Sequence, residues 1–118
     1  MVLLLQGKKV LLSKLRIAKN PFALAKGLMF TSNQTGALGL LLKLPRKSKL
    51  QATLTNWFVF YDLDVYFLDE HMTVLEYTVL KSFQFSYTPK YPCVQVLEVK
   101  AGTIHKLAIG TKLELKEP

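Results

Sequence analysis

Cysteine is almost absent from this sequence, because Cys93 is the only one among 118 residues. A single cysteine cannot form an intrachain disulfide, so nothing here requires an oxidising compartment. One cysteine and two histidines are also too small a set for a structural zinc site. Cys93 follows Pro92 at the start of an apolar segment, and we expect it to be a small buried side chain.

Long hydrophobic runs are absent as well. The opening run, MVLLL, is short, and Lys8 and Lys9 follow it rather than precede it, which disfavours a secretory signal. No stretch approaches the ~20 apolar residues of a membrane-spanning helix. We therefore expect a cytoplasmic protein without a membrane segment. Half of the residues are hydrophobic, which favours one domain over residues 1–118 with a core of its own.

Acidic residues are missing from the first half of the chain. Ten Lys or Arg and no Asp or Glu precede Asp62, whereas six Lys or Arg and eight Asp or Glu occur from Asp62 onward, which gives +10 − 2 = +8. Such a basic half can bind nucleic acid or another polyanion. The alternative is that the two halves fold against each other and the lysines are solvated on the outer face.

The basic half contains a specific nucleic-acid candidate. Arg46, Lys47 and Lys49 lie on a predicted turn, and Trp57 follows on the next predicted strand. Basic side chains beside aromatic rings can bind single strands by charge and stacking. A solvated turn above a packed core is the competing interpretation.

Alternating and apolar segments predict a chain that is mostly strand. Turn residues at 45–49 and 70–72 predict two hairpins, and prolines predict a loop at 86–92. The predicted strands cover residues 8–18, as one strand or a bent pair, and residues 37–44, 50–61, 63–69, 73–83, 93–99 and 111–117. Consecutive hairpins imply antiparallel pairing, and closure into a barrel would bury these strands.

Two short helices are also predicted. In residues 20–27, Asn20 is a suitable cap, Pro21 suits the first turn and Gly27 suits the residue past the end. In residues 101–110, Ile104, Leu107 and Ala108 have helical spacing, Thr103 is a suitable cap and Gly110 a suitable end. The predicted fold class is thus mostly β, α+β by count, in a compact antiparallel barrel-like domain with two short helices.

Two carboxylates stand out in the aromatic segment 56–70. Asp62 and Asp64 would share one face of an uninterrupted strand, with Cα atoms roughly 6.5–7 Å apart. At that spacing they could hold a metal ion and assist hydrolysis. Alternatively, Asp62 lies in a turn and Asp64 binds backbone N–H groups or a lysine.

Other chemical motifs are weak. His71 lies in a predicted turn, and His105 lies beside Lys106, away from the apolar stripe of its predicted helix. The sequence contains neither a phosphate-binding glycine loop nor a definable nucleophile–base pair. We therefore assign no catalytic residue and expect no cofactor.

Three segments resemble the uncharacterised family called domain of unknown function 192, especially its archaeal-type members without a signal peptide. These segments are KGLMF (26–30), NWFVFYDLDVYFLDE (56–70) and VLEVKAGTIHKLAIGTKLEL (96–115), and the resemblance covers residues 10–116 approximately. It implies a compact, mostly β, barrel-like domain with no assigned activity.

The family's signature residues are recognisable in this chain. They are Gly27, Leu28 and Met29, the step Leu63-Asp64, the pair Leu97-Glu98 and the pair Ala101-Gly102. Two positions depart from the family pattern, because Asn56 replaces a methionine and Asp62 replaces a proline.

Together, the residues and the resemblance predict a small ligand- or partner-binding module, monomeric or weakly dimeric. The candidate ligand-binding residues are Asp64, Gly27, Leu28, Met29 and Asn56. Nucleic-acid binding and a metal-assisted hydrolase using Asp62 and Asp64 remain the alternatives.

Overall fold

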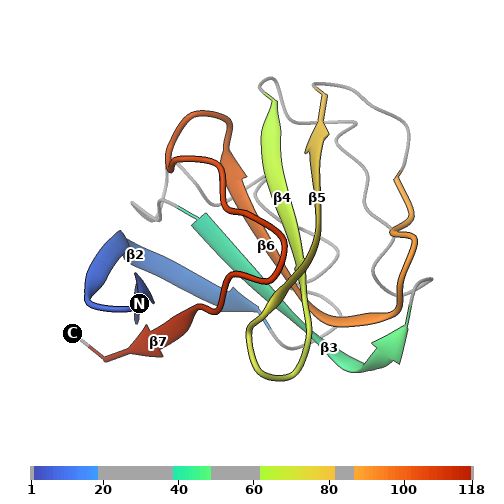
Figure 1. The fold of residues 1–118 in the computed structure, drawn as a ribbon, viewed down its shortest axis with the longest axis horizontal. Helices are drawn as coiled ribbons and strands as arrows, with labels where there is room; N and C mark the ends of the chain where they lie inside the picture. The colour runs from blue at the N-terminus through green and yellow to red at the C-terminus, as the bar shows by residue number, and fades with distance from the viewer. Residues whose placement is uncertain (1, 19–38, 49–61, 82–86, 118) are drawn as a thin grey trace.

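A computed structural model describes residues 2–18, 39–48, 62–81 and 87–117, with side chains at 45–48 left out (Figure 1). Seven strands form one open sheet in the order β5-β4-β6-β3-β2-β1-β7. Their bounds are β1 Val2–Gln6, β2 Lys9–Ala18, β3 Gly39–Ser48, β4 Leu63–Leu68, β5 Val74–Leu80, β6 Cys93–Lys100 and β7 Glu114–Lys116.

The mostly β prediction is confirmed, but the predicted architecture is wrong in three respects. The described residues contain no helix, so the α+β assignment with two short helices does not hold for 101–110. The sheet that the described strands form is open rather than a closed barrel, and β2 pairs with β3 in parallel. The predicted helix 20–27 lies outside the described residues. Within the described ranges, no helix has the length and apolarity to cross a membrane.

Strand β3 lies between β2 and β6. Residues Gly39–Leu42 pair with β2 on one side and with β6 on the other. The predicted hairpin between 37–44 and 50–61 therefore cannot use this part of β3, and β3 continues to Ser48 through the predicted turn 45–49. The connection 19–38 has the length that a parallel crossover requires.

Gly39 permits the close packing of three strands. A Cβ at this position would lie 2.9 Å from both Leu12 Cδ1 and Val99 Cγ1. Such distances are closer than carbon atoms pack in protein interiors. The glycine at the start of β3 is therefore a packing requirement.

The hairpin of β4 and β5 was predicted correctly. Asp69 closes its turn, because its Oδ1 accepts the backbone N–H groups of His71 at 2.8 Å and Thr73 at 2.9 Å. Met72 takes a positive φ of 64° in this turn. The predicted strands 93–99 and 111–117 are also present as β6 and the short β7, and Cys93 is buried as expected.

Both faces of β4 are buried, which explains its nearly continuous apolar sequence. Tyr66 and Leu68 belong to one hydrophobic cluster, whereas Leu63, Val65 and Phe67 belong to a second cluster on the opposite face. Asp64 shares the face of Tyr66, because successive side chains of a strand alternate. After β6, the chain passes over this face of the sheet before it reaches β7 (Figure 1).

Candidate functional site

Residues 101–110 cover the face of the sheet that carries Tyr66, and Asp64 is a buried carboxylate on this face. The Asp64 residue is 9% exposed. Its Oδ1 accepts a hydrogen bond from the Tyr77 hydroxyl at 2.8 Å, and its Oδ2 accepts one from the Gly102 N–H at 3.2 Å. Both carboxylate oxygens therefore hold other parts of the fold in place, β5 through Tyr77 and the segment after β6 through Gly102.

Tyr66 provides a second attachment for the same segment. Its hydroxyl oxygen accepts the backbone N–H of Leu107 at 3.1 Å. Tyr66 lies opposite Tyr77 in the antiparallel pairing of β4 and β5, and their ring centroids are 4.9 Å apart. Burial and the hydrogen bond to Asp64 raise the pKa of Tyr77 to about 12, so its hydroxyl is neutral at physiological pH.

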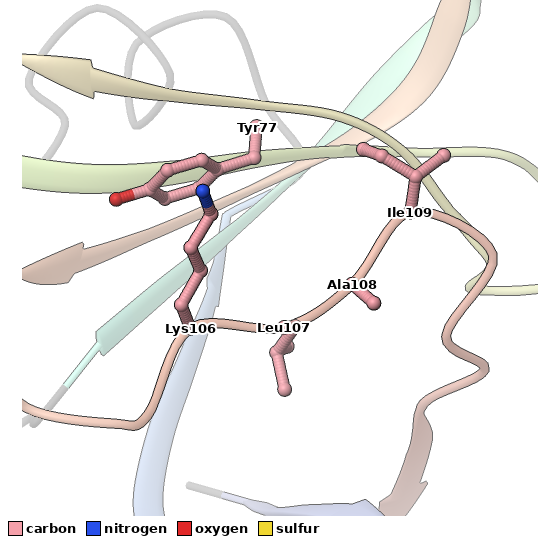
Figure 2. A pocket seen from close by; sticks show the side chains of 5 residues that line it. All are labelled: Tyr77, Lys106, Leu107, Ala108 and Ile109. Atoms are coloured by element: carbon pink, nitrogen blue, oxygen red, sulfur yellow. The ribbon is translucent and has the colours of Figure 1, made fainter.

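A pocket of about 490 Å³ opens between β5 and this segment. Its described lining consists of Tyr77, Lys106, Leu107, Ala108 and Ile109 (Figure 2). The Lys106 side chain points toward the Tyr77 ring, with its Nζ 4.9 Å from the ring centroid. A cation in this position is attracted by the ring's π electrons. Ile109 is 62% exposed at the rim.

Two other buried acids lie on the opposite face of the sheet. Burial raises the pKa of Glu98 to about 7. Glu76 accepts hydrogen bonds from the Tyr87 hydroxyl and from the Lys90 N–H, the latter at 2.8 Å. Glu76 therefore fixes the loop before β6 and does not contribute to the pocket.

The structure brings together two motifs of the resemblance that are far apart in the sequence. Asp64 of the Leu-Asp step accepts the N–H of Gly102 from the Ala-Gly pair. In addition, the Ala101 N–H donates to the Asp62 carbonyl at 2.9 Å. Gly102 has a φ of 87°, a conformation that glycine adopts without strain. These motif residues therefore have a structural role in joining β4 to the segment after β6.

The two aspartates have different surroundings. The Asp62 carboxylate lies 3.5 Å from the ammonium of Lys81, whereas Asp64 faces Tyr77 and Gly102. Among the residues that the structure describes, no three His, Cys, Asp or Glu side chains gather as a metal site would require. His71 and His105 are both exposed.

For several site residues predicted from the sequence, the structure does not describe the side chain. Gly27, Leu28, Met29, Asn56, Lys49 and Trp57 lie outside the described residues, and Arg46 and Lys47 belong to β3 but their side chains are not described. Tyr77 and Lys106 were not among the predicted site residues. Tyr77 follows Glu76 in an apolar–polar alternation that is common to most strands, so the sequence does not distinguish it as a site residue. Lys106 belongs to a predicted helix, on the side away from its apolar stripe.

Two solved structures from bacteria have a similar fold. A protein of unknown function from Novosphingobium aromaticivorans matches with a TM-score of 0.70 at 21% identity, covering 85% of this chain and 73% of that chain. A protein of Sinorhizobium meliloti 1021, whose description proposes a role in transcription regulation, matches with a TM-score of 0.69 at 20% identity, covering 86% and 80%. At these identities the likeness shows the fold alone.

Two archaeal proteins are similar to this chain in sequence. A UPF0127 protein of Pyrococcus furiosus is 32% identical over 111 residues, which covers 92% of this chain and 91% of the relative. A UPF0127 protein of Thermococcus sibiricus is 31% identical over 108 residues, covering 90% and 68%. The model of the family described as "Uncharacterized ACR", domain of unknown function 192, matches residues 2–115. This chain therefore belongs to that family, whose function is unknown.

Proposed function

We propose that this chain is a small binding module that takes a ligand in the pocket between Tyr77 and residues 106–109. The pocket itself carries the proposal. Its volume of about 490 Å³ is within the range of small-molecule sites, which are largely apolar with few polar groups. Asp64, the central candidate from the sequence, would support the site from behind by holding Tyr77.

The walls of the pocket are held in place by hydrogen bonds from within the fold. Asp64 fixes the Tyr77 hydroxyl, and Tyr66 fixes the backbone of Leu107. A wall that is fixed before binding costs a ligand less ordering entropy. This arrangement supports binding rather than a mobile surface loop.

A fragment screen by protein-observed NMR tests the proposal. We expect hits to shift the amide signals of residues 106–109 together with those around Tyr77. Ile109→Trp should abolish these shifts, because the larger side chain at this exposed lining position would obstruct the pocket. Val10→Trp is the matched control, since Val10 is an exposed apolar residue of β2 outside the described lining. The proposal fails if no fragment binds, or if the hits cluster elsewhere and are unaffected by Ile109→Trp.

Nucleic-acid binding is a second candidate. Lys8 and Lys9 are exposed at the β1–β2 turn, and Lys14 is exposed farther along β2, all in the basic half of the chain. This candidate predicts an affinity for a single-stranded oligonucleotide that falls steeply with salt.

Fluorescence anisotropy at several salt concentrations would test this candidate. Replacing Lys8 and Lys9 by alanine should make the salt slope less steep, by roughly one unit for each phosphate that is no longer neutralised. Lys116→Ala, in β7, serves as the control. Affinity that ignores salt, or no binding at low salt, removes the candidate.

A further inference from the structure

The electrostatic character of the pocket restricts what it can hold. Between Val99 and Leu113 the chain contains Lys100, Lys106, Lys112 and His105 but no Asp or Glu. Lys106 is the charged residue among the described lining. An incoming anion therefore meets a basic segment, in which the Lys106 side chain points toward the Tyr77 ring (Figure 2).

Two polar groups of the lining residues are already engaged in hydrogen bonds within the fold. The Tyr77 hydroxyl donates to Asp64, and the Leu107 N–H donates to Tyr66. A ligand rich in hydroxyl or amide groups needs many partners, since each buried polar group left unpaired costs affinity. A polyphosphate is usually held by arginine forks or by several aligned N–H groups. One ammonium beside apolar surface suits neither class.

Resting on the proposed function, we propose that the pocket binds a monocarboxylate with a flat or short apolar body. The carboxylate would pair with the Lys106 ammonium. The body would lie beside the Tyr77 ring and against the side chain of Ile109. The Lys106 ammonium already lies close to the Tyr77 ring, so the cationic and apolar parts of the site are adjacent, as such a ligand requires.

Three naphthalene probes of equal body and different charge provide the test. 2-Naphthoate is a monoanion, 2-naphthamide is neutral, and 2-naphthyl phosphate carries more negative charge. Their dissociation constants would be measured by NMR titration of the intact chain at one ionic strength. We expect 2-naphthoate to bind at residues 106–109 roughly tenfold more tightly than 2-naphthamide, the effect of one charge-assisted contact.

Lysine variants assign that difference to one residue. Lys106→Met should reduce the affinity for 2-naphthoate to that for 2-naphthamide while leaving the amide's affinity nearly unchanged. Lys112→Met is the matched control, because Lys112 is an exposed lysine of the same segment outside the pocket lining. In this variant the tenfold preference should persist.

The other outcomes distinguish a wrong ligand class from a wrong binding site. If 2-naphthamide binds in the pocket as tightly as 2-naphthoate, or if 2-naphthyl phosphate binds more tightly, the monocarboxylate assignment is wrong and the pocket remains a binding site. If no probe perturbs residues 106–109 and the fragment screen also gives no hit there, both proposals fail. Equal loss of 2-naphthoate binding in Lys106→Met and Lys112→Met would contradict a specific role for Lys106.

Discussion

At the scale of single residues, Glu98 makes the stability of the fold depend on pH. It is 5% exposed on the face opposite the pocket, and burial raises its pKa from 4.5 to about 7. The folded chain therefore holds this proton more tightly than the unfolded chain does. The resulting stabilisation is complete below pH 4.5 and is lost as the pH rises through about 7.

Urea denaturation between pH 4 and pH 8 measures this effect. In the wild type, we expect the free energy of unfolding to fall by on the order of 3 kcal/mol between these pH values, since one pKa unit corresponds to about 1.4 kcal/mol. Glu98→Gln should remove this fall. Glu70→Gln, at an exposed turn position, should keep the wild-type profile. An unchanged profile in Glu98→Gln would show that another group titrates.

The carboxylate of Asp64 is predicted to contribute to stability through two different bonds. Asp64→Asn weakens the acceptor of the Gly102 N–H and the partner of Tyr77, and should cost about 1–3 kcal/mol. Tyr77→Phe removes one of these bonds. In a double-mutant cycle the two changes should be non-additive, because they share that bond. Additive costs would argue against the Asp64–Tyr77 bond in solution.

Part of this arrangement could be foreseen from the sequence. An aspartate within an apolar run needs a hydrogen-bond donor in order to be buried, and the sequence predicts a backbone N–H as one possible partner of Asp64. The partner Tyr77 could not be foreseen, because it lies 13 residues away and reaches Asp64 only through the register of β4 and β5. The pocket was missed for the same reason, since it requires β5 and residues 106–109 to meet.

At the scale of elements, the segment 101–110 shows how tertiary contacts override a helical pattern. Ile104 and Leu107 are buried, as the spacing predicted, but Ala108 is exposed. The N–H groups of Gly102 and Leu107 bind side chains of β4 instead of carbonyls four residues earlier. A ten-residue helix advances only about 15 Å. The segment instead turns after β6 and again near Gly110, whose N–H binds the carbonyl of Val74 at the start of β5.

Packing at the start of β3 gives a prediction of its own. Gly39→Ala should destabilise the fold by ~1–3 kcal/mol, because the added methyl group would overlap Leu12 and Val99. Adding Val99→Ala should recover part of this loss by removing one overlapping group. Thermal and urea unfolding of the three variants would measure both effects. A neutral Gly39→Ala would mean that neighbouring strands separate at little cost.

At the scale of the whole molecule, the chain after β6 ties the two ends of the open sheet together. The Val74 N–H donates to Thr111 and the Leu113 N–H donates to Met72, at 2.8 and 2.9 Å, so this segment is bound to the β4–β5 hairpin. A few residues later, β7 pairs with β1. Leu113, which is 1% exposed, lies between these two attachments.

Leu113→Ala should therefore destabilise both ends of the sheet, the β1–β7 pair and the β4–β5 hairpin, together. We expect a cost of about 2–5 kcal/mol, as for other buried leucines. Hydrogen exchange should accelerate in β1 and in the β4–β5 turn together. Leu115→Ala, at a half-buried site opposite Leu4, should affect β1 more than the turn. Faster exchange confined to one end in Leu113→Ala would contradict the coupling.

The pairing of β1 with β7 also has a consequence for biosynthesis. Strand β1 precedes the other described strands in the chain, yet its outer edge pairs with β7, residues 114–116, which is the last of them. Until those residues leave the ribosome, the apolar sequence VLLLQ has an uncovered edge, of the kind on which strands of other chains can add. Such distant pairing is slow to form. Nascent chains should therefore depend on chaperones during synthesis more than the stability of the finished fold would indicate.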